Sequence, residues 1–184
     1  FSFSQWEPKL PSTMPAKELN VKAVWTEGTA TPYKVEHYQQ NIDDDLYTLK
    51  DTENLSGTTN SNTSAAAKNY EGFTSKSFKQ EKIEADGSTV VKIYYDRNTY
   101  QLTFDSDGGS SIEPVTLKYG ATVTPPSNPT RTGFSFSQWE PELPSTMPAK
   151  ALNVKAVWAE GTATPYNVEH YQQNIDDDLY TLKD

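Results

Sequence analysis

Residues 1–51 of this chain recur almost unchanged as residues 134–184, an offset of 133 residues (134 − 1). Only four of the 51 aligned positions differ, and they are Lys9/Glu142, Glu18/Ala151, Thr26/Ala159 and Lys34/Asn167. A period of this length is too long for one solenoid unit and suits one or two whole domains. We therefore expect a natural tandem repeat with further copies in the parent protein, the alternative being an engineered duplication.

The composition favours several thin cores over one large core. Apolar residues make up 34% of the chain, and aromatic residues 12%, with 11 tyrosines. The net charge is −9, which disfavours nucleic acid and anionic lipid as partners. The absence of cysteine excludes disulfides, thiolate metal sites and thiol nucleophiles. No stretch approaches the roughly 18 apolar residues of a membrane span, so we expect no membrane insertion.

Turn-rich connectors divide each period into two module types. We expect a first-type module at residues 32–98 and a complete second-type module at residues 99–159. Residues 1–28 would be the C-terminal part of a second-type module, and residues 164–184 the N-terminal part of a first-type module. Because the connectors are too short for flexible tethers, the modules are expected to form an elongated rod.

Alternating and β-branched patterns predict mostly strands in both modules. In the first module, we expect strands at 33–40 and 47–49, a short helix at 63–69 with Ser64 as N-cap, and a hairpin whose arms, 79–85 and 89–96, flank Asp86-Gly87. In the second module, strands are expected at 100–104, 115–119 and 152–158. The predicted fold class is mainly β or α+β, with small, mostly antiparallel sheets over aromatic cores.

Both modules resemble known repeat families. The second module resembles the Listeria–Bacteroides repeat, the B-repeat type of internalins, at residues 100–109, 115–120, 129–136, Trp139 and 152–158, although Gln138 replaces the usual Gly. The first module resembles a mucin-binding-protein (MucBP) type repeat at residues 33–38, 70–73 and 86–91. These resemblances imply β-grasp, ubiquitin-like modules of bacterial cell-wall proteins, with no catalytic residues to carry over.

Few side chains are candidates for catalysis, metal binding or covalent crosslinking. His37 and His170 are the same position in two copies, so each period has a single histidine and lacks the partners of a catalytic triad. Asp105 and Asp107 begin a calcium-loop pattern, but Thr116 stands where the bidentate Glu of an EF-hand would be, so a turn is favoured. A Lys–Asn crosslink of the kind found in some surface stalks is a further, weaker possibility.

Other candidates are surface features. Asp43–Asp45, repeated as Asp176–Asp178, forms an acidic turn that could attract a cation, although solvated turn charges are favoured. Trp6, Trp25, Trp139 and Trp158 are expected to anchor cores. Tyr38, Tyr94 and Tyr171 are expected to face outward, where a shallow contact to a host glycan or protein is possible.

The sequence thus favours a non-enzymatic structural stalk without cofactors. Such repeats would lie outside the cell, on the bacterial cell surface, and would project a functional domain while contacting neighbouring repeats of the same chain. The alternative is an adhesin module that binds host mucin glycans or protein weakly and multivalently. The partial modules at the two ends lack strands, so we expect them to be disordered or completed by a neighbouring molecule.

Overall fold

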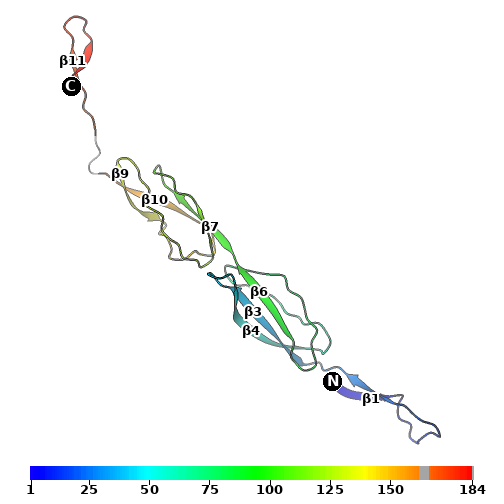
Figure 1. Cartoon of the computed structure of the whole chain (residues 1–184). Coiled ribbons are helices and arrows are strands. Elements are labelled where there is room, and N and C mark those ends of the chain that lie inside the picture. The colour runs from blue at the N-terminus through cyan, green and yellow to red at the C-terminus, as the bar shows by residue number, and fades with distance from the viewer. Residues whose placement is uncertain (162–165, 184) are drawn as a thin grey trace. The chain divides into compact units, whose positions relative to one another are not determined.

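The computed structural model describes residues 1–161 and 166–183, and every regular element within them is a strand (Figure 1). Among these residues, none lies in a helix that could cross a membrane. The mainly β class is confirmed, whereas the short helix expected at residues 63–69 is wrong. The Gln80 side chain explains the difference, because it donates to the carbonyl of Ala65 at 2.8 Å and accepts from the Ala65 N–H at 2.9 Å. A helix beginning at Ser64 would need the Ala65 carbonyl as the acceptor for the N–H of Asn69.

Two compact units make up the chain. The first comprises residues 1–101, 116–122 and 146–151, and the second comprises residues 102–115, 123–145 and 152–184. In the second unit, residues 162–165 and 184 lie outside the description. The limits of the units therefore follow tertiary contacts and cut across the repeat, because two segments from beyond residue 115 pack in the first unit.

The main sheet of the first unit has the order β4-β3-β6-β5. Its strands are β3 (Thr31–Gln40), β4 (Tyr47–Gly57), β5 (Phe73–Ser75) and β6 (Val90–Arg97). The two central strands, β3 and β6, run parallel, and the outer pairs are antiparallel. The sheet is thus mostly antiparallel, as expected, with one parallel pair at its centre.

The hairpin expected at Asp86-Gly87 is wrong. These two residues do form a turn, with Gly87 at φ 75°, but residues 79–85 do not pair with the strand that follows. That strand, β6, pairs with β3 from Lys34↔Val90 to Gln39↔Tyr95. The reason is burial: in this register the apolar face of β6 joins the apolar face of β3 over one core.

A single cluster forms the core of this sheet. Val91, Ile93 and Tyr95 are buried, as their alternation with Lys92 and Tyr94 predicted. They pack with the inward residues of β3 and with side chains from the following loops, the full cluster being Tyr33, Val35, Ala65, Ile83, Val91, Ile93 and Tyr95. The other face of the sheet is thereby left to solvent.

A second four-stranded sheet has the order β8-β7-β10-β9. Its strands are β7 (Thr99–Asp105), β8 (Val115–Lys118), β9 (Phe134–Glu140) and β10 (Leu152–Glu160). As in the first sheet, the two central strands run parallel; here they are β7 and β10, and β10 pairs antiparallel with β9. Leu102, Val154 and Ala156 are buried in its core. Both sheets therefore have the same strand order and a parallel central pair.

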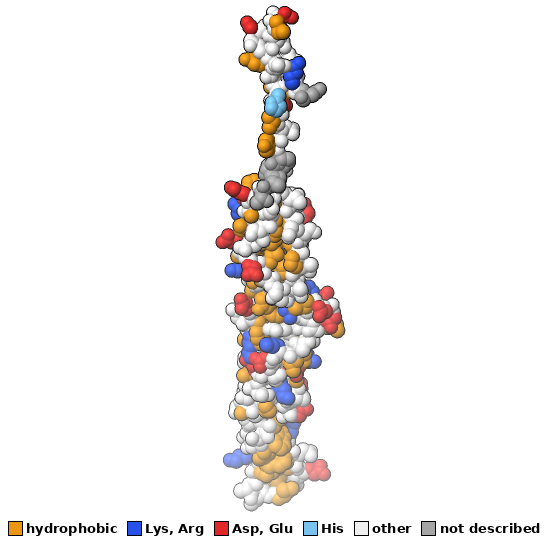
Figure 2. Space-filling model, turned by 90° about the vertical axis from the view of Figure 1, so that its left-hand side faces the viewer, with side chains coloured by type: hydrophobic (Ala, Val, Ile, Leu, Met, Phe, Trp, Pro, Cys, Tyr) orange, Lys and Arg blue, Asp and Glu red, His pale blue; other side chains and the backbone are white. Residues whose placement is uncertain are grey.

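The partial copies at the ends form hairpins. β1 (Ser2–Glu7) pairs with β2 (Lys22–Thr26), and β11 (His170–Gln173) pairs with β12 (Tyr180–Lys183). The described residues of the partial copies are thus ordered as hairpins, because hairpin pairing is local. Their completion by a neighbouring molecule stays a prediction. The expected exposure of apolar side chains is observed, and Figure 2 shows hydrophobic side chains gathered on the surface at the N-terminal end.

Candidate functional site

The outer face of the first-unit sheet carries a cluster of tyrosines, here called the aromatic face: Tyr38, Tyr47 and Tyr94. Tyr38 on β3 and Tyr94 on β6 are partners in the parallel register, and their rings stack with centroids 5.1 Å apart. The Tyr47 ring of β4 meets the Tyr94 ring edge-on, also at 5.1 Å. Tyr38 and Tyr47 are half-buried, and Tyr94 is exposed. Sequence reasoning identified Tyr38 and Tyr94 but missed Tyr47, which the turn at residues 41–46 returns to the same sheet.

Charged side chains surround the aromatic face. The Lys92 ammonium lies 5.8 Å from the centre of the Tyr38 ring, and the Lys76 ammonium 5.5 Å from that of Tyr47. The Tyr47 hydroxyl donates to Asp96, and Lys76 donates to Tyr47 at 3.2 Å. Flat rings next to donors are the elements with which proteins stack on and hydrogen-bond to ligands. This arrangement can hold a ligand by contact but offers no reactive group.

The Tyr38 hydroxyl donates a hydrogen bond of 2.7 Å to Glu36, and this bond raises the pKa of Tyr38 to about 12 from its ordinary 10.0. Because the pKa in the folded protein is the higher one, the bond stabilises the fold below pH 10 and its contribution disappears as the pH rises to about 12.

We expect the substitution Glu36→Gln to let Tyr38 ionise at lower pH, since the carboxylate charge that opposes tyrosinate is gone. Absorbance at 295 nm during an alkaline titration measures this change. Tyr171 provides the matched control: its hydroxyl donates to Glu169 at 2.7 Å, and this bond also raises its pKa. Glu169→Gln should advance the ionisation of Tyr171 in the same direction. An unchanged titration in both variants would contradict the assignment.

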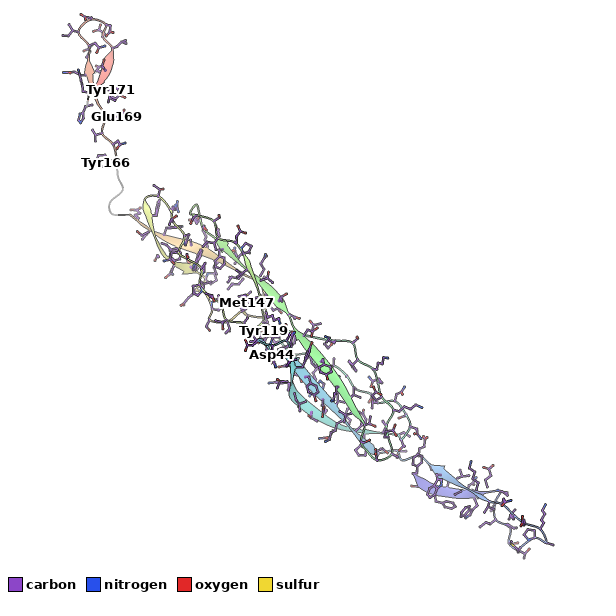
Figure 3. The ribbon with its side chains drawn as sticks, in the orientation of Figure 1. Asp44, Tyr119, Met147, Tyr166, Glu169 and Tyr171 are labelled. Carbon is purple, nitrogen blue, oxygen red and sulfur yellow. The ribbon has the colours of Figure 1, made fainter. Side chains whose placement is uncertain are left out.

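Tyr171 belongs to a different unit from the tyrosines of the aromatic face. It sits on β11, in the second unit, and is 56% exposed (Figure 3). The described part of that partial copy ends at Lys183, so it holds no counterpart of Tyr94, which is the ring that stacks on Tyr38. The structure thus brings together two of the three tyrosines predicted to face outward.

His37 is fully buried and belongs to a hydrogen-bonded network. Its Nδ1 lies 2.8 Å from the Tyr95 hydroxyl, and its Nε2 lies 3.4 Å from Glu53. A carboxylate can only accept, so the neutral ring carries its proton on Nε2 and Nδ1 accepts from the Tyr95 O–H. The Tyr95 oxygen in turn accepts from the backbone N–H of Lys68 at 2.8 Å. This histidine joins three segments of the fold. His170, its copy, is exposed.

The Lys68 ammonium contacts two carboxylates, Asp51 and Glu53, the latter at 3.0 Å. These contacts hold the pKa of Asp51 and of Glu53 below the usual range and raise the pKa of Lys68. An amine held protonated in this way is not a nucleophile. Lys68 is therefore an ion-pair centre held between two carboxylates. The Lys–Asn crosslink stays a prediction.

The Asp105–Gly109 segment forms a turn closed by its own side chains. Asp105 accepts from the backbone N–H of Asp107 at 2.9 Å, and Asp107 has a φ of 47°. The Asp107 carboxylate pairs with Lys155 at 2.8 Å and with Arg131 at 3.5 Å, and the Lys155 contact holds its pKa below the usual range. In the part of the chain that the structure describes, no cluster of three His, Cys, Asp or Glu side chains could hold a metal ion.

An open groove of about 480 Å³ lies in the second unit beside this turn. Asp107, Arg131, Lys155 and Glu140 line it together with Phe134 and Trp158. The Arg131 guanidinium lies 4.2 Å from the centre of the Phe134 ring, which fixes it against the wall. The central carboxylate is neutralised by two cations, so the groove presents an ion-pair network on a shallow surface.

The acidic turn at residues 43–45 uses its carboxylates locally. Asp44 accepts from the Asn41 side chain at 2.9 Å and from the Leu46 N–H at 3.0 Å, and these bonds hold its pKa below the usual range. Asp177 repeats both bonds in the second copy. Asp45, with φ 56°, pairs with Lys118. The turn is thus hydrogen-bonded within itself.

The tryptophans of the complete second-type module act as core anchors. Trp139 is 7% exposed and meets the Phe104 ring edge-on at 5.3 Å. Trp158 is half-buried, and its indole N–H donates to the Ser106 carbonyl at 3.1 Å. The Trp158 ring also lies so close to Gly109 that any side chain there would overlap it. Trp6 and Trp25, the same positions in the partial copy, are exposed.

Residues 100–148 match the family model of the Listeria-Bacteroides repeat domain. Two proteins of Evansella cellulosilytica are similar as well. One, provisionally named a Gly-rich membrane protein, is 38% identical over 59 residues, which are 32% of this chain and 7% of that protein. The other, provisionally named a membrane protein, is 38% identical over 50 residues, or 27% of this chain and 8% of its own length. The chain thus spans less than a tenth of either relative. The predicted resemblance to the Listeria–Bacteroides repeat is confirmed for residues 100–148. The internalin B-repeat type of that module and the MucBP-type resemblance of the first module stay predictions.

Proposed function

We propose that this chain is a stretch of stalk repeats from a protein of the bacterial cell surface, lying outside the cell. The observation that carries the proposal is the repeat itself: two sheets with one topology, joined by minimal connectors. β6 ends at Arg97 and β7 begins at Thr99, so a single residue joins the two modules. Such a connector leaves little freedom to a chain built to span distance. The order of the strands in both sheets supports the β-grasp architecture that the resemblances imply.

The proposal includes the absence of an enzymatic role. The polar groups best suited to catalysis take part in structural bonds: His37 joins three segments, and Asp107 pairs with two cations. Lys68 is likewise held between carboxylates. Side chains fixed in this way support the sheets on which the modules depend.

Small-angle X-ray scattering tests the stalk proposal. We expect a protein of two complete periods to give a maximum dimension close to twice that of one period, with a cross-section unchanged between the two. This follows because connectors of one to a few residues restrict bending between modules. A maximum dimension that grows much less than twofold, or a featureless Kratky plot typical of a flexible chain, would contradict the proposal.

The aromatic face supports a second candidate function, a weak contact to glycans or host protein. The stacked pair Tyr38 and Tyr94, with Lys92 beside it, is the observation in its favour. In that case, binding to immobilised mucin should rise steeply with the number of periods and fall when both tyrosines are replaced by alanine. Equal, negligible binding by one and by three periods would remove this candidate and leave the stalk proposal untouched.

A further inference from the structure

A short turn from the second-type module packs in the first unit. Residues 116–122 belong to that unit, and Lys118, Tyr119 and Gly120, here called the docking turn, form its tip. The Tyr119 ring covers Gly72, where any added side chain would overlap the ring, and it meets the Phe73 ring edge-on at 5.8 Å. Figure 3 shows Tyr119 next to Asp44 and Met147. The docking turn therefore covers the end of β5, the edge strand of the first sheet.

The Arg97 side chain, at the end of β6, donates a hydrogen bond to the main chain of the docking turn. Its Nη1 donates to the Tyr119 carbonyl at 3.0 Å, and its Nε donates to the Gln40 carbonyl at 2.7 Å. The guanidinium also lies 4.8 Å from the centre of the Phe73 ring. One cation thus joins the ends of β3 and β6 to the docking turn, and a planar guanidinium is suited to such divergent bonds.

Two more contacts fix the position of the docking turn. The Tyr119 N–H donates to the Asn98 carbonyl at 2.8 Å, and the Asn98 N–H donates to the Gly72 carbonyl at 2.9 Å. Lys118 pairs with Asp45 at the tip of the β3–β4 hairpin. The docking turn is therefore connected to the ends of β3, β5 and β6 and to the turn between β3 and β4.

Met147 supports the docking turn from its other side. The Gly120 N–H donates to the Met147 carbonyl at 2.8 Å, and the Met147 N–H donates to the Ala121 carbonyl at 2.9 Å. Met147 is 1% exposed, whereas Met14, its copy in the partial module, is 81% exposed. Burial of this methionine thus accompanies formation of the complete contact.

We propose that the docking turn is an inter-repeat lock, which makes a first-type module reach full stability only when a second-type module follows it. The partner that this edge recognises is a Lys-Tyr-Gly turn of the next repeat in the same chain. The inference rests on the proposed stalk function and deepens it, because a lock of this kind resists opening at the junction. The folding unit is then larger than either repeat.

Hydrogen–deuterium exchange of the full chain tests the lock. In Tyr119→Ala, we expect backbone amides of residues 70–76 and 94–98 to exchange about tenfold faster, because the ring covering this edge is lost. Tyr119→Phe keeps the ring and both main-chain bonds and should exchange like the native protein. Tyr166→Ala removes an exposed tyrosine and is the second control. Faster exchange confined to residues 116–122 and 145–148 would overturn the lock.

A double-mutant cycle with Gly72→Ala separates the contact from backbone strain. Gly72 has a φ of 76°, so alanine is strained there in any background. If the Tyr119 ring also requires glycine at this position, Gly72→Ala should accelerate the exchange of residues 70–76 in the native chain. In the Tyr119→Ala background, the same substitution should accelerate that exchange by a factor at least about fivefold smaller. Equal effects in both backgrounds would show that only φ matters and would refute the lock. The stalk proposal would stand in that case, since its own test is the scattering of two periods.

Discussion

Replacing Trp139 by alanine is expected to destabilise the second unit by about 3–5 kcal/mol, the usual cost of removing a large buried ring. The ring is 7% exposed and packs against Phe104 of β7 and Phe136 of β9. Its loss leaves a cavity between the strands that the surrounding side chains cannot fill. Urea unfolding followed by far-UV circular dichroism, together with hydrogen exchange of residues 152–158, measures the change.

The chain supplies the matched control for this substitution. Trp6 lies in the identical octapeptide, residues 1–8, but is 40% exposed because its hairpin lacks the strand that corresponds to β7. We expect Trp6→Ala to leave the exchange of residues 152–158 unchanged and to have a much smaller effect on unfolding. Comparable destabilisation by the two substitutions would contradict the packing described for the complete module.

Replacing His37 by alanine is expected to destabilise the first unit by about 2–4 kcal/mol. The ring is fully buried, and its removal opens a cavity while leaving the Tyr95 hydroxyl without the acceptor to which it donates. His170→Ala, in the exposed copy, should change stability little. Thermal unfolding, with exchange of residues 90–97 to locate the effect, measures both. A negligible effect of His37→Ala on these amides would contradict the structural role of the network.

The two histidines also show which contacts the local sequence alone can specify. Glu-His-Tyr occurs at residues 36–38 and at 169–171, and in both copies the tyrosine donates to the glutamate. That bond joins residues two apart in the chain, so the partial copy reproduces it. Burial of the histidine requires β6 and the loop that carries Lys68, which only the complete copy has.

The candidate site was likewise predictable from local sequence only in part. Alternation predicted that Tyr38 and Tyr94 face outward, because side chains alternate along a strand. Their stacking required the parallel pairing of β3 with β6, and the sequence instead suggested that β6 pairs with residues 79–85 across Asp86-Gly87. Turn signals identify a change of direction, but burial of the apolar face decides which strand is the neighbour. The helix expected at residues 63–69 is absent for a related reason, since the Gln80 side chain hydrogen-bonds to the backbone of Ala65.

Composition, period and local alternation were enough to predict the repeat, the absence of cysteine chemistry, the mainly β class and the similarity of residues 100–148 to the Listeria-Bacteroides repeat. The folded chain was needed to show that β3 and β6 run parallel, that Asp107 pairs with Lys155 and Arg131, and that Tyr119 covers Gly72. Each of these joins residues far apart in the chain. Such contacts arise when apolar faces are buried together, and no local pattern specifies which faces meet.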